Sequence, residues 1–168
     1  MTARLTLLLG LIFFGSLTTQ AQLSADRVEL FGGYSYLRLR TSPAGNFNGW
    51  ELAGQYKLTS WLGGVADFDG HYGKIAGASS SVYTFLFGPQ VSWPTRVSPF
   101  AHVLLGGAHL GVGGLASTSF SAAIGAGIDT TISERFSWRV IEIDYLPTRF
   151  DSRTQSNARI TTGIVIRF

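Results

Sequence analysis

The sequence predicts an all-β fold, an eight-stranded antiparallel up-and-down transmembrane β-barrel. In the segment from Ala158 to Phe168, apolar side chains recur at every second position, which indicates a β-strand with two unlike faces. The segment also has the ~9–11 residues that a tilted strand needs to cross a bilayer. Charged residues make up only 14% of the chain and hydrophobic residues 45%, and glycine interrupts nearly every segment with helical periodicity. This alternation, this composition and the recurrence of similar segments together predict the barrel.

Eight segments alternate in this way, and turn or loop residues separate them. Pro89 falls inside the fourth segment and cannot donate to a ladder, so we expect a β-bulge there. The connections alternate between long and short, which is typical of the extracellular loops and periplasmic turns of outer-membrane barrels. Both termini are then expected on the periplasmic side. The predicted strands are residues 27–39, 48–58, 62–72, 81–92, 99–110, 120–130, 136–146 and 158–168.

The first residues predict export from the cytoplasm. Arg4 precedes an apolar stretch from Leu5 to Phe14, and Thr19-Gln20-Ala21 supplies the small residues of a cleavage site. This pattern is typical of a secretory signal peptide, because the apolar stretch is too short for a membrane-spanning helix. We therefore expect residues 1–21 to be a signal peptide and residues 22–168 to form the barrel. The chain has no cysteine, which excludes disulfides, thiolate metal sites and a cysteine-linked lipid anchor.

Alternation alone does not distinguish a membrane barrel from a soluble one, since only the polarity of the two faces differs. Acidic residues lie in mid-strand on the polar face, among glycine and alanine, and small residues suit an interior that a few long side chains fill. Aromatic residues collect near both ends of the predicted strands, which is the distribution of the aromatic girdles at the two bilayer interfaces of membrane barrels. The predicted interface aromatics are Trp61, Trp93 and Trp138 by the short turns and Tyr36, Trp50, Tyr72, Tyr83 and Tyr145 toward the long loops.

Charged residues on the polar face are predicted to fill the lumen as a structural network of ion pairs, because buried charges must be paired or neutralised. Strand adjacency places Asp144 near Arg159 on the extracellular side. It places Glu29 near Arg167 on the periplasmic side, where the first and last strands close. The predicted network consists of Glu29, Glu51, Asp67, Asp69, Glu142, Asp144, Arg159 and Arg167, with His102 also pointing inward.

Several strand motifs resemble those of one family. FGGYSY (31–36), WLGGVADF (61–68), FLFGPQ (85–90), IEIDYLPT (141–148) and GIVIRF (163–168) are similar to the small outer-membrane β-barrel domain family, the OmpA/OmpX-type barrels. The resemblance covers the predicted mature chain and implies a fold and a location in the bacterial outer membrane. It also implies that Ile164, Ile166 and Phe168 form a signal for the barrel-assembly machinery. We do not transfer the peptidoglycan binding of OmpA, which resides in a separate domain after its barrel.

The residues predict no catalytic activity, no cofactor and no metal site. The nearest candidate combines His71 with Asp69 on one strand face, with Glu51 as a third metal ligand, but a hydrogen-bonded lumen histidine is the simpler interpretation. The net charge of +3 comes without a Lys/Arg cluster, so we expect no nucleic-acid partner. The sequence therefore predicts a monomeric structural protein of the envelope.

The predicted partners are outer-membrane lipids, lipopolysaccharide and, during insertion, the barrel-assembly machinery. Cations at the extracellular strand ends are suited to pair with lipopolysaccharide phosphates. These cations are Arg38, Arg40, Lys74, Arg149, Arg153 and Arg159. The alternative functions are an adhesin-like or ligand-binding surface barrel, a narrow channel and a lipid A-modifying enzyme.

Overall fold

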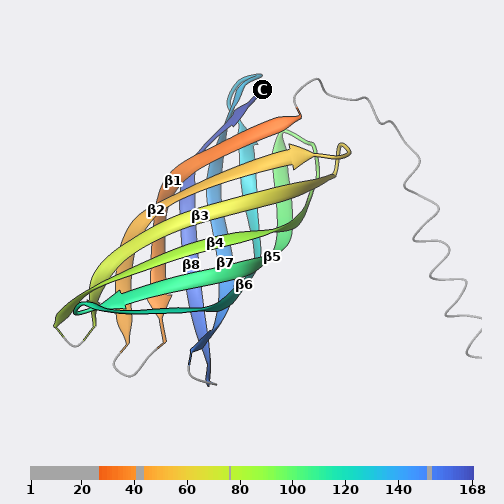
Figure 1. Cartoon of the computed structure of the whole chain (residues 1–168). Helices are drawn as coiled ribbons and strands as arrows, with labels where there is room; N and C mark the ends of the chain where they lie inside the picture. Colours follow the sequence, from red (N-terminus) through yellow and green to blue (C-terminus); the bar gives the residue numbers. More distant parts are fainter. Residues whose placement is uncertain (1–26, 41–43, 76, 151–152) are drawn as a thin grey trace, which may run out of the picture.

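The structure, a computed structural model, describes residues 27–40, 44–75, 77–150 and 153–168. The predicted signal peptide, residues 1–21, lies outside the described residues. The described chain forms eight strands that pair in sequence order as one closed antiparallel barrel (Figure 1), which confirms the predicted fold class. The strands are β1 (Val28–Leu39), β2 (Gly45–Lys57), β3 (Leu62–Ile75), β4 (Ala78–Ser92), β5 (Val97–Val112), β6 (Leu115–Thr131), β7 (Phe136–Phe150) and β8 (Arg153–Arg167).

The two ends of the barrel are distinct. β1 closes the barrel against β8, with Glu29 opposite Arg167 and Arg38 opposite Ala158. We call one end the terminal end, because it carries Arg27, Phe168 and the turns between β2 and β3, β4 and β5, and β6 and β7. The opposite end, the hairpin end, carries the other four connections. No helix among the described residues is long and apolar enough to cross a membrane.

The strands extend further toward the hairpin end than the sequence predicts. Pairing continues to Ile75 opposite Ala78 and to Val112 opposite Leu115. Most of 73–80, 111–119 and 147–157, which were predicted as long loops, is therefore strand. The tight connections use glycines with positive φ, at Gly77 (84°), Gly113 (56°) and Gly114 (91°), a conformation that other residues rarely adopt. The predicted difference between long and short connections is therefore wrong.

The β-bulge lies in β7 and not at Pro89. Pro89 stands opposite Gly64 in an unbroken register between β3 and β4. In β7 the register shifts between Arg139 and Glu142 relative to β8, so one extra residue is accommodated there. Val140 and Ile141, the two residues between them, are both exposed on the outer face. Regular alternation through the predicted strand 136–146 places Val140 on the lumen face with Glu142 and Asp144, and the bulge makes that placement wrong.

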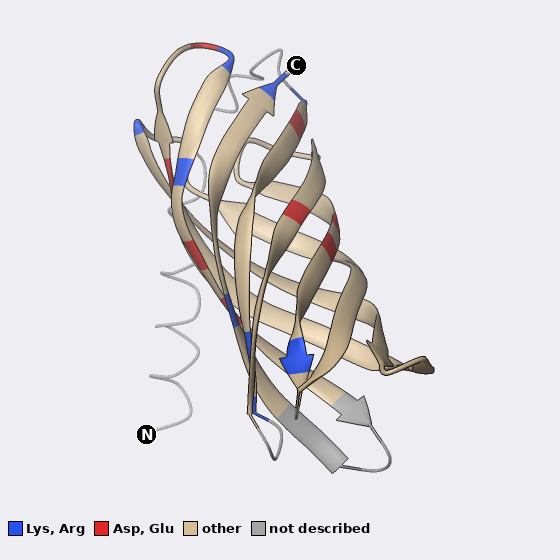
Figure 2. Cartoon of the chain, turned by 90° about the vertical axis from the view of Figure 1, so that its left-hand side faces the viewer, with Lys and Arg blue, Asp and Glu red and all other residues tan. Residues whose placement is uncertain are grey.

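The outer and inner faces of the barrel differ in polarity. Adjacent residues of β5 show the contrast, since Leu105 is 49% exposed on the outer face and Leu104 is fully buried in the lumen. Large apolar side chains cover the outside on every strand, whereas the buried set includes many acidic, basic and hydroxyl side chains. Figure 2 shows acidic positions midway along the strands. Toward the hairpin end, the lumen is filled by apolar side chains, among them Leu37, Leu39, Phe47, Val82 and Leu146.

Candidate functional site

Arg159 of β8 lies at the centre of the lumen charges and is fully buried. Its Nε donates to Oδ2 of Asp144, directly opposite on β7, at 2.8 Å. Its Nη2 donates to Oδ2 of Asp67 at 2.7 Å, and its Nη1 donates to Asp69, both on β3 across the lumen. Oε2 of Glu51 on β2 lies 3.3 Å from Nε. We call these five residues the Arg159 cluster, in which one guanidinium connects four strands.

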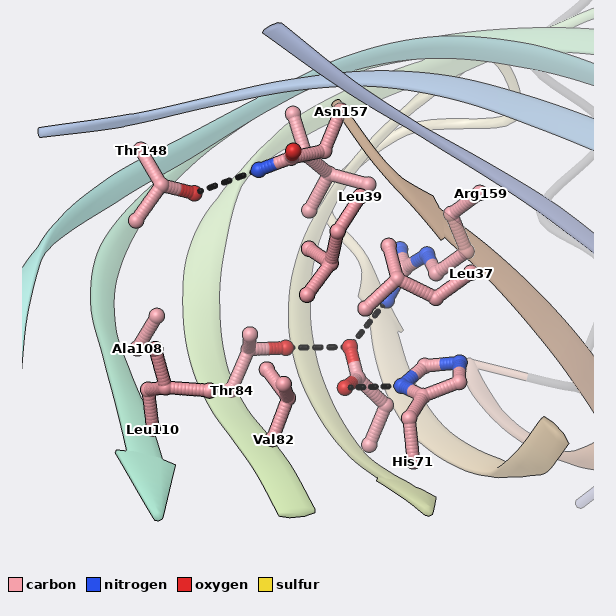
Figure 3. Close-up of a pocket in the computed structure, with 12 residues that line it drawn as sticks. Leu37, Leu39, His71, Val82, Thr84, Ala108, Leu110, Thr148, Asn157 and Arg159 are labelled. Atoms are coloured by element: carbon pink, nitrogen blue, oxygen red, sulfur yellow. Dashed lines mark hydrogen bonds and ion pairs between the residues drawn. The ribbon is translucent and has the colours of Figure 1, made fainter. Parts of the chain in front are cut away.

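His71 adjoins the Arg159 cluster on the hairpin side (Figure 3). Its Nδ1 lies 3.0 Å from Oδ1 of Asp69, and its Nε2 lies 2.9 Å from Oγ of Ser35. Thr84 donates a further hydrogen bond to Asp69. Both ring nitrogens thus have partners, which is the arrangement of a hydrogen-bonded lumen histidine. The structure does not gather His71, Asp69 and Glu51 into a cation site; the groups whose oxygen or nitrogen atoms converge, within the described chain, are His102, Glu142 and Asp144, and Glu51, Asp67 and Glu142.

Arg139 of β7 forms a second buried charge centre that the sequence prediction missed. Its Nη1 donates to Glu142 at 2.6 Å and its Nε to Asp129 on β6 at 2.9 Å. The rings of Phe31 and Phe100 lie 4.4 and 4.2 Å from its Cζ, within the range of cation–π contacts. Arg139 and Glu142 both face the lumen although they are three positions apart, because the bulge adds one residue between them. The sequence does contain a signal for the lumen position of Arg139, which is the spacing of polar residues. Arg139 lies three positions before Glu142, whereas regular alternation requires two.

The terminal end of the lumen carries a third group of charges. Glu29 receives hydrogen bonds from Lys57 at 2.6 Å and from Nε of Arg167 at 2.9 Å. These residues border a polar basin of about 420 Å³ that also includes Gln90 and Asp129. At the hairpin side, the cavity of Figure 3 measures only about 20 Å³, which is room for about one water molecule.

The eight predicted network residues lie on the inner face of the barrel, but the Asp144–Arg159 pair lies in the middle of the lumen and not toward one end as the sequence predicts. Glu29, Glu51, Asp67, Asp69, Glu142, Asp144, Arg159 and Arg167 all face the lumen, and the expected pairs Asp144–Arg159 and Glu29–Arg167 are present. His102 also faces inward, with Nε2 2.8 Å from Oδ1 of Asp144. The side chain of Arg159 is fully buried in the lumen and cannot contact lipopolysaccharide. The prediction that Arg159 is one of the lipopolysaccharide-contacting cations is therefore wrong. Arg38, Arg40 and Lys74 are exposed at the hairpin end, while the side chains of Arg149 and Arg153 lie outside the described residues.

The predicted aromatics lie on the outer face in two groups. Trp61, Trp93 and Trp138 are exposed near the terminal end. Toward the hairpin end, the hydroxyls of Tyr72 and Tyr83 lie 2.9 Å apart, and the rings of Trp50 and Phe68 are 5.4 Å apart. Tyr36 and Tyr145 share this face, as do the side chains of Ile164, Ile166 and Phe168 on and beside β8.

A closed eight-stranded barrel with an apolar exterior and a charged, filled lumen is the fold of the small outer-membrane barrels. Neisserial surface protein A has this fold, with 13% sequence identity, 86% of this chain and 99% of that chain covered, and a TM-score of 0.74. The Yersinia pestis attachment invasion locus protein, Ail, matches with 19% identity, 86% and 100% coverage and a TM-score of 0.62. The N-terminal barrel domain of Pseudomonas aeruginosa OprF matches with 13% identity, 85% and 98% coverage and a TM-score of 0.51. No protein-family model and no curated protein matches the chain.

Proposed function

We propose that the chain is an integral protein of the bacterial outer membrane, with a structural role in the envelope and no catalytic activity. The observation that carries this proposal is the inverted polarity of the barrel. Apolar side chains such as Leu30, Phe85 and Leu105 are about half exposed outside, while charged side chains are buried inside. A contiguous apolar exterior is unfavourable in water and is what a lipid environment requires. Fractionation with the outer membrane and heat-modifiable migration on a gel test the proposal; recovery as a soluble protein would contradict it.

In this proposal, the terminal end faces the periplasm and the hairpin end faces the cell exterior. The exposed tryptophans near the terminal end fit one bilayer interface, because indole rings prefer that depth. The protein acts as a monomer, and the outward side chains of Ile164, Ile166 and Phe168 present its last strand to the assembly machinery. Surface labelling of a tag inserted at Gly113–Gly114 on intact cells tests the orientation. Labelling that requires permeabilised cells would reverse it.

The hairpin end is proposed to contact lipopolysaccharide through basic side chains. Arg38, Arg40 and Lys74 are exposed there, and guanidinium and ammonium groups form charge-assisted hydrogen bonds with phosphates. We expect lipopolysaccharide to raise the unfolding temperature of the wild-type protein more than that of a variant with serine at all three positions. A variant with Arg96→Ser and Arg135→Ser, two exposed basic residues of the terminal-end turns, is the matched control. Equal stabilisation of the triple variant and wild type would contradict this contact.

A surface-binding role is the second candidate function, and the same three cations favour it. Ail of Yersinia pestis, an attachment invasion locus protein with this fold, has been solved with the heparin analogue sucrose octasulfate. The exposed basic side chains at the hairpin end give this chain positive charge to which a sulfated polyanion can bind. The test is sucrose octasulfate binding by the barrel in zwitterionic vesicles. Loss of binding in the Arg38, Arg40 and Lys74 serine variant would support the role, and no binding by the wild type would exclude it.

A further inference from the structure

The middle of the lumen contains more acidic than basic side chains. Even if both imidazoles of His71 and His102 are protonated, the carboxylates remain in excess. Lys57 and Arg167 lie at the terminal mouth, where both contact Glu29. Uncompensated charge is costly in a buried site, so the excess must be offset by a bound cation or removed by protons on the carboxyl groups. Apart from Glu29 at the terminal mouth, the buried carboxylates of the described residues are those of Glu51, Asp67, Asp69, Asp129, Glu142 and Asp144, and the buried guanidinium groups are those of Arg139 and Arg159.

Three of these carboxylates, those of Glu51, Asp67 and Glu142, converge in the middle of the lumen. One carboxylate oxygen from each lies within 4.8 Å of the other two, and all three side chains are buried. Asp67 is held by Arg159 and Glu142 by Arg139. Oε2 of Glu51 accepts a hydrogen bond from a threonine of β8 at 2.8 Å. Oε1 of Glu51, in contrast, is buried and accepts no hydrogen bond from any described residue. A buried carboxylate oxygen without a donor, beside two further carboxylates, is a ligand atom for a cation.

We propose that Glu51, Asp67 and Glu142 bind one hard divalent cation of the size of Ca²⁺ inside the lumen. Ligands that are all oxygen select hard cations over thiophilic ones. Ca²⁺ takes about six to eight oxygen ligands in flexible geometry, whereas Mg²⁺ dehydrates reluctantly and is usually held by only one or two carboxylates. Three carboxylates that converge within 4.8 Å of one another therefore favour Ca²⁺. Water supplies the remaining ligands, and the double charge of the cation offsets part of the carboxylate excess.

Two polar cavities approach this site from the terminal end. The polar basin of about 420 Å³ opens there, and a smaller cavity of about 10 Å³ continues inward, with Glu29 and Gln90 lining both. The smaller cavity also borders Ala53 of β2, and Glu51 is the next lumen-facing residue along that strand. On the other side of the Arg159 cluster, the small cavity of Figure 3 is lined by leucine side chains together with polar ones such as Thr84 and Asn157. The polar cavities that approach the site therefore lie on its terminal-end side.

The test is Ca²⁺ binding by the purified protein folded in a zwitterionic detergent, which lacks the anionic headgroups that bind cations themselves. After treatment with a chelator, calorimetric titration with CaCl₂ is expected to show one Ca²⁺ per chain, and Ca²⁺ is expected to raise the unfolding temperature. Glu51→Gln keeps the shape of the side chain and removes its charge, so it should abolish both effects. Glu29→Gln is the matched control, because Glu29 is a lumen acid whose contacts are Lys57 and Arg167. It should bind Ca²⁺ as the wild type does.

Glu142→Gln is a second variant, in which Arg139 keeps Asp129 as a partner. It should weaken Ca²⁺ binding by at least about tenfold, and heat-modifiable migration shows whether each variant is folded. The proposal is overturned if the wild type binds no Ca²⁺, if Glu51→Gln binds it as tightly as the wild type, or if Mg²⁺ binds more tightly than Ca²⁺. An infrared band of a protonated carboxyl group that Glu51→Gln removes from the Ca²⁺-treated protein would assign a proton to the site and also overturn it.

Discussion

Asp144 and Arg159 stand directly opposite each other on β7 and β8, and Nε of the arginine donates to the carboxylate at 2.8 Å inside the lumen. Replacing Arg159 with methionine leaves the surrounding carboxylates without their shared cation. Breaking a buried pair in this way typically costs ~3–5 kcal/mol, so we expect Arg159→Met to lower the free energy of unfolding by at least about 3 kcal/mol. Urea unfolding in lipid vesicles measures the change. Arg40→Met, at an exposed arginine, is the control, and equal stability of the two variants would contradict the account.

Because β7 contains a bulge, one residue of this strand can be deleted without changing which of its side chains face the lumen and which face outward. Deleting a residue from a regular strand exchanges its two faces, but Val140 and Ile141 both face outward. Deletion of Val140 therefore leaves Arg139 and Glu142 in the lumen, and we expect this variant to fold. Deletion of Val103 from the regular strand β5 should prevent folding. Heat-modifiable migration after refolding shows whether each deletion variant folds. A Val140 deletion that does not fold would contradict this expectation and show that the bulge has another role.

Charge on the outer face should destabilise the barrel according to its depth in the bilayer. Leu105 lies in the middle of β5 and Leu115 lies beside the turn at the hairpin tip. Arginine at the midplane of a barrel costs ~2–4 kcal/mol and near the interface ~0–1 kcal/mol. We expect costs of this order for Leu105→Arg and Leu115→Arg, respectively, in urea unfolding from vesicles. Similar costs at the two positions would contradict placement of mid-β5 in the membrane.

The filled lumen should not conduct. The Arg159 cluster occupies its middle, and the apolar side chains of Leu37, Leu39 and Leu146 occupy the hairpin side. Such an interior leaves no continuous aqueous path, as is usual for eight-stranded barrels. Planar bilayers with the inserted protein are expected to show no steady large current at neutral pH. A steady large current would contradict this prediction, because it would require the lumen side chains to leave their packed positions and open an aqueous path.

Much of the barrel follows from the period of two in the sequence. The lumen position of Glu51 or Arg159 required only that a polar residue alternate with apolar neighbours. Pairing across the barrel is different, because Arg159 meets Asp67 and Asp69 on a strand that is not its neighbour. Alternation specifies which face a side chain occupies, whereas side-chain length and barrel curvature decide which charges meet across the lumen.

Two departures have identifiable causes. Gly, Ser and Thr in residues 73–80 and 111–119 are typical of loops, yet backbone pairing with a neighbouring hairpin arm suffices to keep them in strands. Arg139 was missed because a bulge adds one residue and so shifts the phase of the alternation. Polar residues recur at every second position on either side of the bulge, whereas the step from Arg139 to Glu142 is three residues long. This step marks the position of the bulge in the sequence. Pro89 was the more obvious breaker, but its pairing with β3 keeps the regular register.

The inverted polarity of the barrel is tested most directly by magnetisation transfer from lipid acyl chains to leucine methyl groups in a bilayer nanodisc. Leu104 and Leu105 are neighbours in β5, with exposed fractions of 0% and 49%. We expect strong cross-peaks from the acyl chains to Leu105, and also to Leu30 and Leu52, and none to Leu104 or Leu86. Cross-peaks to Leu104 and none to Leu105 would contradict this expectation, because the apolar outer face would then not be in contact with lipid.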